Sequence, residues 1–294
     1  MSRILVTGSG GQLGRELVLL AEARGHAVAR LGRHEPEPCD VTDAEALRRR
    51  VNAFGPELVI HAAAWTAVDD CEADPERAHL VNAGGTANVA AAAEAVGAHV
   101  VYVSTDYVFD GSKVGPYVES DPPAPRSAYG RSKLAGEQAL DPRHTVARTS
   151  WVSGAHGPNV VRTILRVAAE RPELRFVDDQ VGNPTFTADL APALLDLGLD
   201  RAAGTWHVTN QGTVSWHGFA RSVLAAAGLD PDRVVPIATA DLDPPRPAPR
   251  PANSALDGAA LRAAGRPPLR DFHEPLAELV AAIAPEAGPR PARP

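Results

Sequence analysis

A short strand followed at once by a glycine-rich turn opens this chain, and no other feature restricts its fold as strongly. Residues 4–7 form a continuous apolar run, as in a parallel strand that is buried on both faces. Gly8, Gly11 and Gly14 follow, and apolar spacing predicts a helix over residues 12–24. Such glycines let a chain turn sharply, approach a pyrophosphate and pack a helix closely on a strand. The opening segment therefore predicts a dinucleotide-binding α/β fold.

The first half of the chain continues this pattern. Short β-rich runs alternate with alanine- and leucine-rich helical patterns, which is typical of a parallel sheet with helices on both faces. We therefore expect a doubly wound parallel α/β sheet. Strands are predicted at residues 27–31, 58–63, 99–105 and 145–151, and one long helix at residues 75–96.

Beyond residue 152 the pattern is less regular. The predicted elements are a helix near 159–170, strands at 174–178 and 206–209, a helix that begins at Ser215, and an extended proline-rich loop at 243–251. Ser215 is expected to cap the helix that it begins, because a serine hydroxyl accepts a hydrogen bond from the first-turn N–H groups.

The composition excludes several classes of function. The chain has 294 residues, and its 44% hydrophobic and 22% charged residues are typical of a globular protein. A net charge of -7 disfavours nucleic acid as the main partner, because phosphate binding needs a basic surface. The two cysteines, Cys39 and Cys71, have no metal-type spacing and predict no disulfide framework. No apolar run approaches the roughly 20 residues that span a membrane, and no leader pattern opens the chain, so we expect a cytoplasmic protein.

Three side chains in the middle of the chain suggest carbonyl chemistry. Tyr129 and Lys133 are four residues apart on a predicted helix and therefore adjacent on one face. A tyrosine has an ordinary pKa of about 10, and a nearby cation favours the phenolate and lowers that pKa. Thr105 ends the fourth predicted strand, at the edge where open α/β sheets bind ligands, and its hydroxyl would hydrogen-bond a reacting carbonyl. Together with the glycine turn, the three indicate nicotinamide-dependent reduction or oxidation.

The end of the second predicted strand favours NADP(H). An acidic residue there would bind the ribose 2′-hydroxyl of NAD, whereas an arginine favours the 2′-phosphate of NADP. The strand ends in Arg33, and no carboxylate occurs before Glu35. NADH remains an alternative, and the other interpretation of Arg33 is a solvated loop residue. Asp40 is expected to accept a hydrogen bond from the adenine amino group, with Val41 packed on the ring.

The complete set of expected cofactor contacts combines the glycine turn, the small residues after the third strand and the Tyr/Lys pair. It is Gly8, Gly11, Gln12, Leu13, Gly14, Arg33, Asp40, Val41, Ala62, Ala63, Ala64, Tyr129 and Lys133.

With these residues the chain resembles the extended short-chain dehydrogenase/reductases, and within them the dTDP-4-dehydrorhamnose reductases. The resemblance runs over nearly the whole chain through several specific strings. They are Ala62–Asp69 (AAAWTAVD), Ser104–Gly111 (STDYVFDG), Tyr129–Glu137 (YGRSKLAGE), Arg148–Trp151 (RTSW), Asp179–Thr185 (DQVGNPT) and Arg250–Leu256 (RPANSAL).

The resemblance implies a Rossmann-type fold and a reaction. Thr105, Tyr129 and Lys133 become the catalytic triad of an NADPH-dependent reduction of the C4 ketone of a dTDP-4-keto-6-deoxy sugar. The expected substrate is dTDP-4-dehydro-L-rhamnose and the product dTDP-L-rhamnose. The residues implied around the sugar are Thr66, Val68, Asp106, Tyr107 and Trp151, with Arg250 and Asn253 on the far side. Core packing of Trp151 and solvation of Arg250 in its proline-rich loop are the alternatives.

The resemblance also bears on a metal. Some relatives bridge a dimer with a metal that several glutamates hold. Glu16 matches one such residue, but Asp189 and no glutamate follows Pro184-Thr185. We therefore expect no required metal. The oligomeric state stays open, with a homodimer as one outcome.

Three other functions remain in competition. A sugar-nucleotide dehydratase would need an Asp-Glu pair after the catalytic threonine, whereas Tyr107 follows Asp106 here. A non-catalytic NADP-binding regulatory subunit, like the β subunit of methionine adenosyltransferase, would share the same motifs. A 4-ketoreductase for another nucleotide deoxysugar, or for a dihydrostreptose-type antibiotic pathway, differs by a few hydrogen bonds that motifs do not display.

Together these features predict how the chain is divided. Residues 1–152 are expected to form an NADP(H)-binding Rossmann core that includes the catalytic helix. Residues 153–284 are expected to complete that core and to bind substrate as a smaller lobe that is no independent domain. Residues 285–294 have almost nothing to bury and are expected to be disordered.

Overall fold

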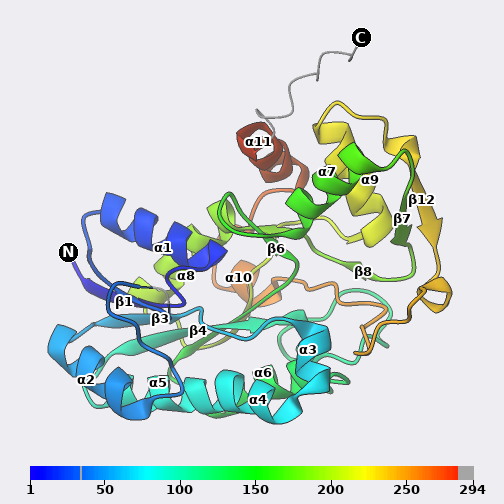
Figure 1. Ribbon diagram of the computed structural model, residues 1–294. Helices are drawn as coiled ribbons and strands as arrows, with labels where there is room; N and C mark the ends of the chain where they lie inside the picture. The colour runs from blue at the N-terminus through cyan, green and yellow to red at the C-terminus, as the bar shows by residue number, and fades with distance from the viewer. Residues whose placement is uncertain (34, 284–294) are drawn as a thin grey trace.

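Six parallel strands form the central sheet of the protein, whose computed structural model describes residues 1–33 and 35–283 (Figure 1). In spatial order they are β10 (Gly204–His207), β5 (Thr145–Thr149), β4 (His99–Thr105), β3 (Leu58–His61), β1 (Arg3–Thr7) and β2 (Ala27–Leu31). Strands β2 and β3 pair with opposite edges of β1. The strand order therefore reverses between β1 and β3, and open α/β sheets bind their ligands outside the carboxyl ends of strands at such a point.

Helices cover both faces of this sheet (Figure 1). One layer is α1 (Gln12–Ala23) with α8 (Thr187–Leu199), and the other is α2 (Ala44–Phe54), α5 (Gly85–Glu94) and α6 (Ala128–Gln138). In β1, Ile4 and Val6 face the first layer and Leu5 faces the second, because side chains alternate along a strand. All three are fully buried. The predicted doubly wound sheet is confirmed, and β2 and β4 have the predicted bounds.

The helix predicted as one continuous α-helix over residues 75–96 is interrupted in its middle by a turn that is not α-helical. It consists of α4 (Pro75–His79), a π-helical turn over Leu80–Gly84, and α5. Asn82 lies in the π-helical turn, and its side chain is hydrogen-bonded outside the helix. A π-helical turn inside a longer helix is frequently found at functional sites.

A smaller lobe lies above the carboxyl end of the sheet (Figure 1). Its core is formed by α7 (Val160–Glu170), α9 (Trp216–Ala226) and α11 (His273–Ile283), with the parallel pair β7 (Leu174–Val177) and β12 (Val234–Ile237). The predicted cap is confirmed, because the Ser215 hydroxyl accepts a hydrogen bond from Gly218 N. The short remaining helices and strands are α3 (Val68–Ala73), α10 (Ala259–Ala263), β6 (Val152–Ser153), β8 (Val181–Gly182), β9 (Thr185–Phe186) and β11 (Val214–Ser215), and three 3-10 turns lie at Asp106–Val108, Pro231–Arg233 and Thr239–Asp241.

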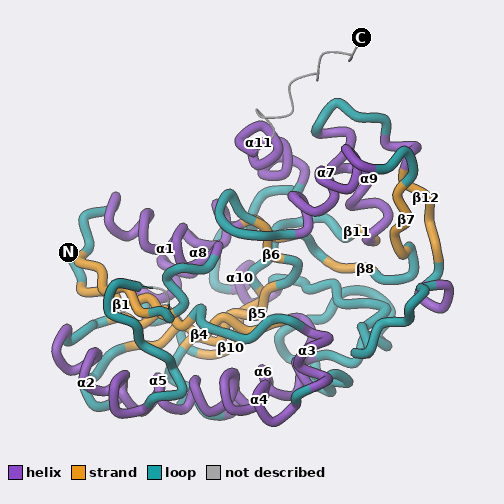
Figure 2. Tube along the Cα trace, viewed as in Figure 1, coloured by secondary structure: helices purple, strands orange, loops and turns teal. Residues whose placement is uncertain are grey.

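The second half of the chain also contributes to the main sheet. Strand β10 pairs with β5 at the edge of the sheet (Figure 2), and α8 packs against α1. A division near residue 152 stays a prediction, and these two elements fit the expectation that the later residues complete the core. The expected disorder of residues 285–294 lies outside the described residues. None of the helices within residues 1–33 and 35–283 is long and apolar enough to cross a lipid bilayer.

Candidate active site

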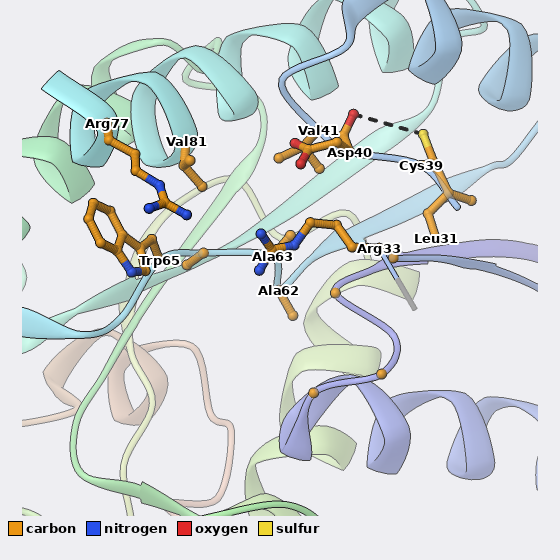
Figure 3. Close-up of a pocket in the computed structure, with 15 residues that line it drawn as sticks. Leu31, Arg33, Cys39, Asp40, Val41, Ala62, Ala63, Trp65, Arg77 and Val81 are labelled. Carbon is orange, nitrogen blue, oxygen red and sulfur yellow. Dashed lines mark hydrogen bonds between the residues drawn. The ribbon is translucent and has the colours of Figure 1, made fainter. Parts of the chain in front are cut away.

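Two adjoining cavities open at the carboxyl ends of the central strands. The first, of about 350 Å³, lies beyond β1, β2 and β3 and is lined by Arg33, Asp40 and Val41 among others (Figure 3). The second, of about 490 Å³, lies beyond β1, β4 and β5 and is lined by Tyr129 and Lys133 among others. Gly8, Gly11, Ala62 and Ala64 line both cavities. The glycine turn therefore lies between them.

The geometry of the glycine turn leaves no room for a side chain at Gly8 or Gly14. Gly8 has a φ of +68°, and a Cβ there would lie 2.7 Å from Ala63 N. A Cβ on Gly14 would lie 2.1 Å from the Gly8 carbonyl oxygen. Helix α1 begins at this turn after Gly11, which has no side chain to cap it. Its first N–H groups and the positive end of its dipole can bind phosphate, so the turn fits a dinucleotide pyrophosphate.

The first cavity contains polar groups that suit an adenosine. Asp40 Oδ1 accepts hydrogen bonds from Thr42 N at 2.9 Å and from the Thr42 hydroxyl at 2.8 Å. These bonds hold the pKa of Asp40 below its ordinary value. Arg33 is exposed, and it lines the first cavity together with Ala63 (Figure 3). The motif analysis missed Arg77, whose guanidinium carbon lies 4.6 Å from the centroid of the Trp65 ring in the same cavity.

Glu35 has a contact that the sequence analysis did not foresee. Its Oε1 accepts a hydrogen bond of 2.6 Å from the Ser9 hydroxyl, within the glycine turn. The backbone N–H of Ser9 donates to the Leu31 carbonyl at the end of β2. A carboxylate and the Arg33 guanidinium therefore lie at the same end of β2.

Lys133 is buried and holds its own helix to strand β4. Only 2% of Lys133 is exposed, and its Nζ donates a 2.7 Å hydrogen bond to the Val103 carbonyl. Burial lowers the pKa of Lys133 to about 7, while the charge of Glu137 opposes that shift. Burial also raises the pKa of Tyr129 well above its ordinary value. Lys133 is not among the groups that oppose this rise, so the expected lowering of the Tyr129 pKa by Lys133 is not observed.

Thr105 is hydrogen-bonded within its own loop. Its hydroxyl donates to Asp106 Oδ1 at 2.8 Å and accepts from Tyr107 N at 3.2 Å. Thr105 opposes the rise in the pKa of Tyr129, so the two side chains are neighbours. Burial raises the pKa of Asp106 to about 6. The other Asp106 oxygen, Oδ2, is buried without a hydrogen-bond partner among the described residues.

Two stacked tryptophans form a wall of the second cavity. Trp151, directly after β5, and Trp216, the first residue of α9, both line it. The sequence analysis assigned no role to Trp216. Its only signal was an aromatic residue next to a helix cap, which is common in cores.

The structure brings most of the predicted substrate residues together at the second cavity, but two of them, Arg250 and Asn253, do not line it. Thr66, Val68, Asp106, Tyr107 and Trp151 line the second cavity with the three predicted catalytic residues.

Arg250 and Asn253 have structural partners instead. Arg250 forms a two-pronged ion pair with Asp69, with both N–O distances 2.7 Å. The Asn253 amide donates to the carbonyls of Lys113 and Gly115 and accepts from Ala255 N.

Asn82 joins the two halves of the site and was not predicted. Its amide oxygen accepts from Trp65 N at 2.7 Å, and its nitrogen donates to the Ser132 hydroxyl at 2.9 Å. Ser132 in turn donates to the Tyr129 carbonyl. The loop after β3 is thereby tied to α6. Two glycines, Gly84 and Gly85, inside a predicted helix were the available signal, since glycine disfavours helix interiors.

The described residues show no metal site. Within residues 1–33 and 35–283, no three His, Cys, Asp or Glu side chains are grouped so that they could hold a metal ion. Asp189 accepts hydrogen bonds from Asn210 and Arg270.

Comparison with known proteins agrees with this geometry. The dTDP-4-dehydrorhamnose reductase of Streptomyces griseus is 44% identical over 97% of this chain and 95% of its own length. A dTDP-4-keto-6-deoxy-D-glucose reductase of Streptomyces niveus is 39% identical, over 92% and 93%. The crystal structure of a Bacillus anthracis dTDP-4-dehydrorhamnose reductase in complex with NADP has a TM-score of 0.90 and 35% identity, covering 95% of this chain and 99% of that one. The family described as the RmlD substrate binding domain matches residues 1–284, and the chain belongs to this family.

Proposed function

We propose that this protein is an NADPH-dependent reductase that converts dTDP-4-dehydro-L-rhamnose to dTDP-L-rhamnose. The observation that carries the proposal is the placement of Thr105, Tyr129 and Lys133 on a cavity that adjoins the glycine turn. A hydride donor bound on the turn and a ketone in the second cavity would then lie next to each other. The names of its relatives support the same reaction and cofactor.

NADPH supplies the hydride when it is bound, and the residues of the chain supply the rest. Tyr129 is the proton donor to the oxygen of the reduced ketone. Its raised pKa keeps the phenol protonated at neutral pH, as a donor requires. Thr105 is adjacent and hydrogen-bonds the same oxygen, which orients the ketone. Lys133 supports the charge that develops there and contacts the nicotinamide ribose.

The proposed cofactor contacts are the glycine turn and the residues of the first cavity. Asp40 is fixed by Thr42 with its second oxygen available to an adenine amino group. Arg33 provides the cation for a 2′-phosphate. Glu35 lies close by through Ser9, so we expect NADH to be accepted as well, at lower efficiency.

The proposed sugar site is the second cavity. Trp151 and Trp216 provide an apolar surface, and Val68 and Tyr107 extend it. Thr66 and Asp106 offer polar groups to sugar hydroxyls. We propose no direct substrate contact for Arg250 and Asn253, which hold the loop between residues 246 and 255 in place. Homodimer formation is part of the proposal, and sedimentation of the purified protein tests it.

One alternative has a specific observation in its favour. The relative from Streptomyces niveus is named a dTDP-4-keto-6-deoxy-D-glucose reductase, and it matches the chain almost as well. That sugar differs only in configuration at carbons that a 3,5-epimerase inverts. A few hydrogen bonds in the second cavity would separate the two substrates.

The test is NADPH oxidation, followed by absorbance, with dTDP-4-keto-6-deoxyglucose in the presence and absence of a 3,5-epimerase. Turnover that requires the epimerase is expected from the proposal. Turnover without it would support the alternative. A Tyr129→Phe variant serves as the control for catalysis. Absence of oxidation in both reactions would overturn the assignment to dTDP sugars.

A further inference from the structure

Glu137 is a buried carboxylate that neither the proposed reaction nor the cofactor site uses. It lies on α6 one helical turn beyond Lys133, with 7% of its side chain exposed. Its Oε1 accepts hydrogen bonds from the Ser104 hydroxyl at 2.5 Å and from Arg148 Nε at 3.0 Å. Its Oε2 accepts from Arg148 Nη2 at 2.7 Å. Two strands, β4 and β5, therefore converge on one side chain of the helix that carries Tyr129.

Three successive residues of β4 are fastened to α6. The Tyr102 hydroxyl donates to the Lys133 carbonyl at 3.3 Å, and Lys133 Nζ donates to the Val103 carbonyl at 2.7 Å. The bond from Ser104 to Glu137 is the third. The next residue of the strand is Thr105. Of these three contacts, the bond from Ser104 to Glu137 is therefore the nearest in the chain to Thr105, whose hydroxyl must face Tyr129.

Close packing at this contact leaves little freedom. A Cβ on Gly136 would lie 2.4 Å from the Tyr102 hydroxyl oxygen. In the register of the sheet, Ser104 pairs with Arg148, so both donors come from adjacent positions. Arg148 has 5% of its side chain exposed. An ion pair buried to this degree is held by its hydrogen bonds, and loss of either partner is costly.

The same carboxylate acts electrostatically on Lys133. Burial lowers the pKa of that lysine, and Glu137 is the charged group that raises it again. Lys133 is surrounded by His61, Tyr102 and Tyr129. Glu137 is surrounded by Tyr102, Ser104 and Arg148. His207 lies next to Arg148. His61 is fully buried with its pKa lowered to about 3, so it is neutral at pH 7.

We propose that Glu137 is a positioning residue of the active site, which fixes α6 against the end of β4 and places a carboxylate one helical turn from the Lys133 ammonium. The proposal rests on the proposed function of Lys133 in ketone reduction. Glu137 itself touches neither cofactor nor substrate. It acts through Ser104 on the strand and through Lys133 on the helix.

The sequence allows a direct test, because the chain has two lysines, Lys113 and Lys133. Protein labelled with ¹³C-lysine gives two titrating NMR signals, and a Lys113→Arg variant assigns them. We expect Glu137→Gln to move the titration of Lys133 to lower pH by about one unit. The matched control is Glu72→Gln, since Glu72 accepts a hydrogen bond from Ala128 N at the start of the same helix. That control leaves the titration unchanged.

A second variant keeps the test possible if Glu137→Gln does not fold. Glu137→Gln leaves Arg148 buried without its charge partner, so the double variant Glu137→Gln/Arg148→Gln removes both charges together. A smaller shift of Lys133 in the same direction is expected in it, because loss of the Arg148 cation opposes loss of the carboxylate. An unchanged titration of Lys133 in folded Glu137→Gln or in the double variant would overturn the proposal.

Kinetics give a readout that separates the two proposals. In Glu137→Gln the pH above which kcat falls is expected to move by the same amount as the Lys133 titration. A structural role alone would lower kcat equally at every pH, and that result would overturn the electrostatic part. Wild-type protein that does not reduce the nucleotide sugar would overturn the proposed function, and the NMR comparison would still decide the role of Glu137.

Discussion

Trp151 stacks face to face on Trp216, with ring centroids 3.6 Å apart and ring planes within 9° of each other. Trp151 follows the sheet strand β5, whereas Trp216 begins a helix of the smaller lobe. Trp151 has a φ of 47°, which costs a residue with a side chain about 1 kcal/mol or more. The stack and the close approach of Gly182 to the Trp151 ring hold this conformation. The two parts of the chain thus meet at the wall of the proposed sugar site.

We predict that Trp216→Ala raises the KM for the nucleotide sugar by about fivefold, because an aromatic pair contributes roughly 1 kcal/mol beyond burial. The Kd for NADPH is expected to stay unchanged, since Trp216 does not line the first cavity. Trp206→Ala is the matched control, because Trp206 packs beside Arg266 at the far edge of the sheet. Steady-state kinetics of both variants check the prediction. An equal effect of the two substitutions on KM would contradict it.

A pair of glycine substitutions tests the phosphate-binding turn. Gly14→Ala places a Cβ 2.1 Å from the Gly8 carbonyl oxygen, so helix α1 must move away from β1. We expect NADPH binding to be lost, or weakened by about a hundredfold, as measured by fluorescence titration. Gly10→Ala is the control, because the nearest atom to its Cβ would be a Glu35 oxygen at 3.9 Å. Comparable binding by the two variants would show that the turn does not hold the cofactor.

Removal of one hydroxyl tests the proton donor. Tyr129→Phe is expected to lower kcat by about 10²- to 10⁴-fold, which is the usual contribution of a general acid. The Kd for NADPH should change little. Tyr117→Phe is the matched control, since its hydroxyl bonds Asp110 outside both cavities. Retention of most of the turnover by Tyr129→Phe would assign proton delivery to another group.

Much of the fold could be predicted because buried parallel strands are locally recognisable. Strands β1 and β4 are largely apolar and buried, β2 is apolar except for Arg30, and the turns that follow these strands contain glycine or polar residues. Helix α8 and the place of β10 were not predicted. Both belong to the sheet layers only through pairing with residues far away in the chain, at β5 and α1. Local patterns carry no information about such pairing.

The site shows the same limit at the level of side chains. Residues that follow a motif spacing, such as Tyr129 and Lys133, were found because spacing on one helix fixes their relation. Trp216 reaches the site only through the packing of the smaller lobe. Arg250 was expected to face the substrate, and its partner proves to be Asp69, a residue of α3 that no local pattern relates to it. Contacts between distant segments therefore required the structure.

Stability is predicted to fall as the solution becomes acidic, because buried histidines must stay neutral. Burial lowers the pKa of His61 to about 3, and of His99 and His207 to about 4, from an ordinary value of 6.5. Below pH 6.5 the unfolded chain therefore binds more protons at these positions than the folded protein. Their contribution to the free energy of unfolding is present above that pH and is lost as pH falls toward 4.

Asp106 works in the opposite direction, since its raised pKa of about 6 lets the folded protein bind a proton first. The lowered pKa values of three histidines outweigh the raised pKa of one carboxyl group. The free energy of unfolding is therefore expected to fall as the pH falls. Urea unfolding at about pH 7.5 and about pH 5 measures it. We expect His99→Gln to reduce the difference between the two conditions, and His79→Gln, at an exposed position, to leave it unchanged. Equal free energies of unfolding at both pH values in the wild type would show that these histidines are protonated in the folded protein.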